Sequence, residues 1–453
     1  MSQSKFPGLL TGLLAAVAVL LVRPLQAAEL TNEALWQEAQ QLEQSEKYDQ
    51  AADRYRAILS SETRWKKRAK AALLAANCLD HIGRSTESIP LLDKAIAEAD
   101  TLLAQNKPGI DESWTLSALY GKAVACEKTG DRAGALKAIE RIRAQFFKSD
   151  EAREALAIQA RLEGWSPQRL TQILAREQEA IQMAEQAAEA SKQNRDQEAV
   201  DLSDRIIQQY PDTAAVYPAM RTKALSLWRL HKYHSAKVVY NDILQRVEPI
   251  APHSQLVRTA QRRVAWLDAT SLFKRLMEQR IRGDSVSDGD WQRVRDLCAT
   301  VTDLTSDPHE RAQVRTIAIE SLYWKGDAKA TIAAAEQFLK EYAGDKKYRL
   351  FKREVAAVQF MLADKLREIG QYQEALAHYR WLIQACEGSD PIDLGAELLS
   401  RLYYRIWWTL GSTGASEAER SSVEQALIST SPHSTYVQCI QVIKQQEEDR
   451  DAR

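Results

Sequence analysis

The chain has 453 residues, of which 45% are hydrophobic and 27% are charged, with only 17 glycines and 12 prolines. Alanine and leucine dominate the apolar residues, which favours helix because both lose little side-chain freedom there. The formal net charge of −1 excludes a whole-chain electrostatic field that would attract nucleic acid or an anionic membrane surface.

Residues 1–27 have the pattern of a secretory signal peptide. One lysine precedes an apolar run, Gly8–Val22, whose length of about 15 residues suits a signal core and is short for a membrane span. The small residues Ala27 and Ala28 follow and predict a cleavage site. Arg23, directly after the run, keeps an uncleaved N-terminal membrane anchor open as the alternative. We expect an exported protein, periplasmic or extracellular, with no membrane span in the mature chain.

The rest of the chain repeats one pattern. In residues 34–58, Ala39 is followed three positions later by a leucine, and a second segment then carries Ala51 and Tyr55 at a spacing of four. Side chains three and four positions apart share one face of a helix, so each copy predicts two amphipathic helices. A glycine between them, such as Gly370, is expected to end the first helix in a left-handed conformation. Further copies, some weaker, cover residues 75–96, 119–142, 183–213, 220–243, 320–339 and 354–385.

This pattern resembles the tetratricopeptide repeat, a unit of about 34 residues made of two antiparallel helices. The tryptophan of the family's first helix is replaced here by Leu35, Leu119, Met183 or Met220, and the family's glycine by alanine. The resemblance implies an all-α fold, an α-α superhelical solenoid with irregular repeats and an atypical C-terminal cap. Such units stack because no helix pair buries its apolar stripe alone.

Interruptions of the pattern predict the organisation of the chain. Pro90 predicts that the helix around it begins late. Residues 254–281 read as one long helix or as a pair without a repeat frame. The expected parts are a signal peptide at 1–27, N-terminal repeats at 28–165, central repeats at 166–250, an irregular helical insert at 251–300, C-terminal repeats with a cap at 301–445, and a frayed tail at 446–453.

The sequence contains no motif of enzymatic or cofactor chemistry. A nucleophile elbow, a phosphate-binding loop, a zinc-protease helix and a dinucleotide fingerprint are all absent. The five cysteines are odd in number and widely spaced, so we expect buried apolar thiols, with one long-range disulfide as the alternative. We predict no catalytic residues, no cofactor and no metal.

The resemblance also implies a binding groove, because the first helices of tetratricopeptide units line a concave surface. Aromatic residues and arginine are enriched in binding hot spots. The positions that would face the groove hold Trp36, Tyr120, Arg221, Trp228, Arg229, Tyr323, Trp324, Phe360 and Arg367.

The expected function is therefore a non-enzymatic protein–protein interaction scaffold of a bacterial-type cell envelope, with a protein or peptide partner in the groove. One alternative is an assembly or regulatory subunit of an envelope or cell-wall complex that holds a separate enzyme. The other is an enzyme built on the solenoid itself.

Overall fold

The computed structural model describes residues 32–60, 67–104, 112–344, 350–387 and 391–451. The predicted signal peptide lies outside these residues. Across the described ranges every regular element is an α-helix. The chain divides into two compact units, Met1–Gln261 and Arg262–Arg453.

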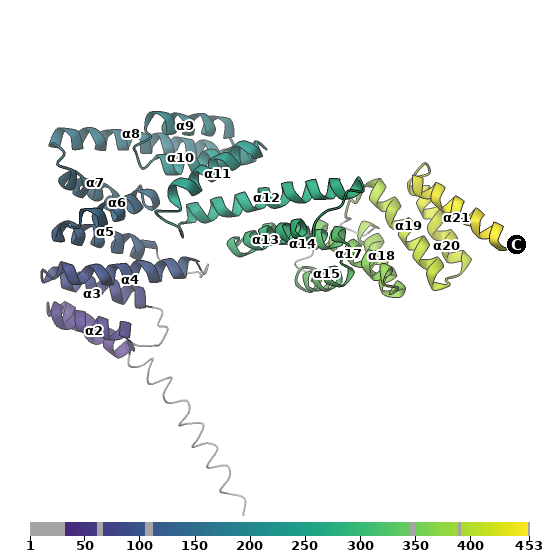
Figure 1. The fold of residues 1–453 in the computed structure, drawn as a ribbon, viewed down its shortest axis with the longest axis horizontal. Helices are drawn as coiled ribbons and strands as arrows, with labels where there is room; N and C mark the ends of the chain where they lie inside the picture. Colours follow the sequence, from purple (N-terminus) through teal and green to yellow (C-terminus); the bar gives the residue numbers. More distant parts are fainter. Residues whose placement is uncertain (1–31, 61–66, 105–111, 345–349, 388–390, 452–453) are drawn as a thin grey trace, which may run out of the picture. The chain divides into compact units, whose positions relative to one another are not determined.

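The first unit is a succession of helices (Figure 1). Each helix packs against its neighbours in sequence, and alternate helices also touch, α3 with α5, α5 with α7 and α8 with α10. Stacked antiparallel helix pairs produce this contact pattern. A helix over residues 32–44 precedes α2 (Tyr48–Ser60), α3 (Arg68–His81), α4 (Ser85–Ala104), α5 (Glu112–Thr129), α6 (Arg132–Gln145), α7 (Asp150–Glu163), α8 (Pro167–Lys192), α9 (Asp196–Gln209), α10 (Val216–Arg229) and α11 (Tyr233–Val247).

The second unit follows the same plan, with α14 touching α17 and α19 touching α21. The long helix α12 (Gln255–Ile281) runs across the division between the units, so residues 254–281 form one helix and not a pair. The remaining helices are α13 (Asp288–Leu304), α14 (Pro308–Lys325), α15 (Ala328–Tyr342), α17 (Lys352–Glu368), α18 (Tyr372–Glu387), α19 (Gly395–Thr413), α20 (Glu417–Thr430) and α21 (Thr435–Asp451). These pairs confirm the predicted all-α solenoid. Helix α21 continues to Asp451, so residues 446–451 of the expected tail are helical in the structure.

The turn inside most helix pairs is built around one residue with a positive φ. Glycine holds this position at Gly83, Gly130, Gly326 and Gly370, with φ between 79° and 88°. The prediction that Gly370 ends its helix in a left-handed conformation is therefore confirmed. The backbone N–H of the next residue, Gln371, then donates to the Leu366 carbonyl at 2.9 Å and satisfies an end of the first helix. Glu46, Asn194 and His231 take the same position with φ of 56–58° and carry the strain of a Cβ there.

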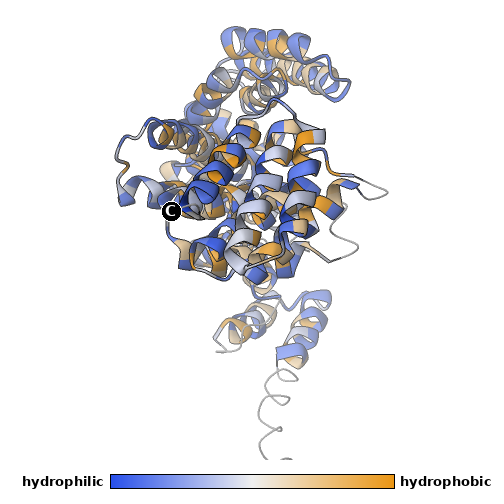
Figure 2. Cartoon of the chain, turned by 90° about the vertical axis from the view of Figure 1, so that its right-hand side faces the viewer, coloured by the Kyte–Doolittle hydropathy of each residue, from blue (hydrophilic) through white to orange (hydrophobic). Residues whose placement is uncertain are grey.

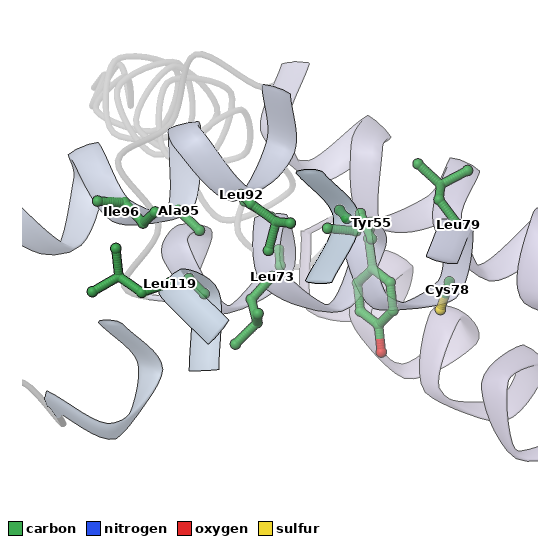
Figure 3. Packing of buried hydrophobic residues seen from close by; sticks show 14 of the residues in the cluster. Tyr55, Leu73, Cys78, Leu79, Leu92, Ala95, Ile96 and Leu119 are labelled. Atoms are coloured by element: carbon green, nitrogen blue, oxygen red, sulfur yellow. The ribbon is translucent and has the colours of Figure 1, made fainter. Parts of the chain in front are cut away.

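The core is made by the residues of the repeat pattern. Ala39, Ala51 and Tyr55 have no exposed surface, and alanine at these points lets two helix backbones approach closely. Figure 3 shows Tyr55 among apolar side chains that include Leu79. The tyrosine that opens the second helix lies at the edge of the core: Tyr48 is half-buried against it, and Tyr233 in another repeat is 38% exposed.

The five cysteines are all free thiols, so the alternative of a disulfide is not realised. Cys78, Cys126 and Cys298 are buried as expected, whereas Cys386 is half-buried and Cys439 is exposed. Burial raises the pKa of the Cys78 and Cys298 thiols to about 12, so both are inert as nucleophiles at neutral pH.

The prediction of a late helix start at Pro90 is wrong. Helix α4 begins at Ser85 and contains Pro90 in its interior. Proline there removes one backbone hydrogen bond, but α4 packs against both α3 and α5 and buries Leu92 and Ala95 between them. Packing on two sides holds the helix together across the missing bond.

Hydrophilic and hydrophobic residues are mixed along the helices (Figure 2). In the described ranges no helix is both long and apolar enough to cross a bilayer.

Candidate functional site

A pocket of about 250 Å³ in the second unit brings three of the predicted groove residues together. Tyr323 and Trp324 reach it from α14, and Phe360 reaches it from α17. Its wall also contains Glu320, Arg353, Ala357, Met361, Leu398 and Arg401. The pocket therefore lies among the first helices of successive pairs, where the sequence predicted a groove.

Helix periodicity places these side chains on one face. Glu320 and Trp324 are separated by four positions on α14, and Arg353, Ala357 and Phe360 follow the same spacing along α17. Residues three, four and seven apart share a helix face. Since α14 contacts α17, the two faces meet in the pocket.

A buried carboxylate, Asp364, lies behind the pocket wall and holds the side chain of the wall residue Tyr323. Asp364 is 1% exposed and accepts hydrogen bonds from the hydroxyls of Tyr323, at 2.7 Å, and Tyr379. Arg405 Nε lies 3.2 Å from its Oδ1. The carboxylate thus joins α14, α17, α18 and α19 in one polar cluster. Burial and the neighbouring Asp364 charge raise the pKa of both tyrosines, so their hydroxyls remain hydrogen-bond donors.

Two more arginines share this carboxylate. Arg367 lies 3.8 Å and Arg401 3.9 Å from Asp364. The Arg367 guanidinium also lies over the Trp408 ring, 5.0 Å from its centroid. The predicted groove residue Arg367 therefore has partners within the chain, and its contact with Trp408 holds α17 against α19.

The aromatic walls of the pocket already attract cations of the chain. The ammonium of Lys365 lies 4.6 Å from the centroid of the Tyr323 ring, and the guanidinium of Arg401 lies 5.1 Å from that of Phe360. Such cation–π contacts follow from the negative face of the ring. The Trp324 ring meets Tyr323 edge-on at 5.7 Å, and no cation from the described residues lies over it.

Glu320 is the unusual charged group of the pocket. It has no hydrogen-bond or ion-pair partner in the part of the chain that the structure describes. Burial without compensation raises its pKa from the ordinary 4.5 to about 7. Arg353 lines the same pocket, yet no ion pair joins it to Glu320. The pocket therefore offers an uncompensated acid that is half-ionised near neutral pH.

No protein-family model matches the chain, and no curated protein matches it. Solved structures with similar helical arrangements include the P58(IPK) TPR domain, at 12% identity with a TM-score of 0.28 over 84% of this chain and 98% of that one. Yeast Tom70 shows 14% identity and a TM-score of 0.31 over 94% of this chain and 90% of that one. The apo form of the quorum sensor NprR from B. thuringiensis shows 10% identity and a TM-score of 0.31 over 89% of this chain and 99% of that one. At these scores the fold assignment rests on the helix pairs described above.

The predicted residues of the first unit do not converge on one site. Trp36 is 4% exposed, and its ring packs edge-on against that of Tyr55 with 5.4 Å between the ring centroids. It therefore belongs to the core and does not face a groove. Tyr120 is half-buried, and its hydrogen bond to Glu154 raises its pKa to about 12. Arg221 lines a second pocket, of about 280 Å³, together with Tyr217.

Trp228 and Arg229 lie at the end of α10 and are engaged by their own unit. Trp228 packs edge-on against Tyr233 at 5.4 Å. Arg229 Nη1 donates to the Ser191 carbonyl at 2.6 Å and lies 3.6 Å from Asp196. These contacts give both side chains a structural role in joining α10 to its neighbours.

The sequence prediction missed four charged residues in or beside this pocket: Glu320, Arg353, Asp364 and Arg401. The groove prediction searched for aromatic residues and arginine, and a lone glutamate among many helical carboxylates gives no signal. Arg401 and Arg405 stand four apart, just before and within the largely apolar stretch LYYRIWWTL, and that spacing is the signal that could have indicated a buried carboxylate partner.

No group of three or more metal-ligating side chains lies together among the residues described.

Proposed function

We propose that this protein is a non-enzymatic interaction scaffold that binds a segment of another polypeptide in the groove of its second unit. The observation that carries the proposal is the pocket lined by Tyr323, Trp324 and Phe360. It combines an apolar wall with a few fixed polar groups, as recognition sites for peptide side chains do. Its volume of about 250 Å³ suits one or two side chains.

The groups around the pocket favour binding over catalysis. The tyrosine hydroxyls that face Asp364 are held as donors by raised pKa values. Asp364 is surrounded by arginines, so it is placed to organise helices and not to accept a proton from a substrate. The described residues of the pocket wall include no serine, threonine, cysteine or histidine that could act as a nucleophile beside Glu320, and the other acid, Asp393, is engaged by the Gly395 backbone N–H at 2.9 Å.

A pocket-filling variant tests the proposal. Ala357 lines the pocket, and Ala357→Trp would occupy it without removing any core side chain. Ala333→Trp, on the exposed face of α15, adds the same bulk elsewhere and is the matched control. We expect partners that co-purify with the wild-type chain to be lost with Ala357→Trp and retained with Ala333→Trp. An identical set of partners for all three chains would contradict the proposal.

We further propose that the protein acts outside the cytoplasmic membrane, in a bacterial-type envelope. The support is the signal-like pattern of residues 1–27 in the sequence. N-terminal sequencing of the protein from envelope fractions should begin near Ala28. An intact N-terminus in the membrane fraction would replace the cleaved signal with an anchor, and recovery from the cytosol would contradict export.

A further inference from the structure

We propose that the pocket of the second unit recognises a basic side chain, lysine or arginine, of the partner polypeptide, through Glu320 and the ring of Trp324. This inference rests on the proposed function and names the chemistry of the residue that enters the pocket.

The position of the two residues carries the proposal. Glu320 and Trp324 lie four apart on α14, so they are neighbours on one helix face, and both line the pocket. A cation placed there would meet a carboxylate and the face of an indole ring together. Tryptophan is the side chain whose ring attracts cations most strongly.

The chain itself leaves this position open. Lys365 covers Tyr323 and Arg401 covers Phe360, so two of the three aromatic rings in the pocket already carry a cation. Trp324 carries none from the described residues. Glu320 is half-buried and has no partner among the described residues either, and an unpaired carboxylate in partly apolar surroundings is unfavourable. A basic side chain from outside would compensate this charge.

The arginines of the pocket wall do not fill this role. Arg401 is occupied by Phe360 and by Asp364. Arg353, on α17, forms no ion pair with Glu320, and the pKa of Glu320 is raised by burial alone, with no lowering by a neighbouring cation. The wall contains two carboxylates, Glu320 on α14 and Asp393 before α19; Asp393 accepts a hydrogen bond from the Gly395 backbone N–H at 2.9 Å, so Glu320, beside Trp324, is the acid left for a basic group.

Selection from a phage-displayed library of random 12-residue peptides on the immobilised full-length chain tests the inference. Peptides are kept only if they bind the wild type and the Ala333→Trp control and fail to bind Ala357→Trp, which restricts the set to pocket-dependent binders. We expect these peptides to be enriched in lysine and arginine. We expect Glu320→Gln to weaken a chemically synthesised binder at least about tenfold, as for loss of one partner of a buried charge pair.

Trp324→Leu, which keeps apolar bulk and removes the indole ring, should also weaken binding. Glu336→Gln, an exposed glutamate on α15, is the matched control and should leave affinity unchanged, and Arg353→Ala should leave it unchanged or increase it.

The outcomes separate the two proposals. Pocket-dependent peptides without basic residues, or with affinity unchanged in Glu320→Gln, would overturn the inference and leave the binding function standing. Acidic peptides that lose affinity in Arg353→Ala would likewise overturn it. A selection that yields no pocket-dependent peptide would overturn both.

Discussion

Glu320→Gln should stabilise the protein at alkaline pH and leave its stability nearly unchanged at acidic pH. The carboxyl has its pKa raised from the ordinary 4.5 to about 7 by burial. Below pH 4.5 it is protonated in the folded and unfolded states, and neither state is penalised. Between pH 4.5 and 7 the unfolded state releases its proton more readily, so the stability of the wild type falls as pH rises. Above pH 7 the loss is complete and amounts to about 3 kcal/mol.

Urea denaturation followed by circular dichroism measures this difference. The free energy of unfolding of Glu320→Gln should exceed that of the wild type by about 3 kcal/mol at pH 8, and by less than about 1 kcal/mol at pH 5. The control Glu336→Gln should differ little from the wild type at both pH values. An advantage for Glu320→Gln that is the same at pH 5 and pH 8 would show that the carboxyl titrates normally and that our account of the pocket is wrong.

Three further outcomes are expected. Gly370→Ala should cost about 1 kcal/mol of unfolding free energy, because its φ of +83° is strained for alanine while the added Cβ meets no atom within 4 Å. Glu46→Gly, at an equivalent turn with φ +56°, should not destabilise the protein. Equal losses of unfolding free energy for the two variants in urea denaturation would contradict this explanation of the turn. Asp364→Asn should cost about 3–5 kcal/mol, since it leaves three partly buried guanidinium groups without their carboxylate. Tyr379→Phe removes one hydrogen bond to that carboxylate and should cost about 1.5–3 kcal/mol. A loss for Tyr379→Phe that equals or exceeds the loss for Asp364→Asn would argue against the charge cluster. A basic pocket-dependent peptide should bind about tenfold more tightly at pH 8 than at pH 6, because Glu320 ionises between them, and titration calorimetry of Glu320→Gln should show no such rise.

The helix pairs could be predicted from local features of the sequence. Apolar residues three or four positions apart, such as Ala51 and Tyr55, recur along the chain, and a turn residue precedes each second helix. These features are local and depend only on helix geometry. The buried alanines and the left-handed Gly370 agree with that prediction. The resemblance to tetratricopeptide repeats, and not the spacing alone, predicted that Tyr323, Trp324 and Phe360 would face a groove, since all three lie on first helices.

Packing between helices decides which side chains are available in the groove. Trp36 and Arg367 satisfy the same sequence rule as Trp324, yet Trp36 is buried against Tyr55 and Arg367 is bound to Asp364. Partners of this kind come from other helices, and helical spacing contains no information about them.

The same reason explains Glu320. Among many helical glutamates its sequence context is ordinary, and its raised pKa results from the apolar walls that α14 and α17 assemble around it. The free energy of a charge depends on the groups within a few ångströms of it. Those groups are brought together by packing, so the acid that distinguishes this pocket becomes visible only in the folded chain.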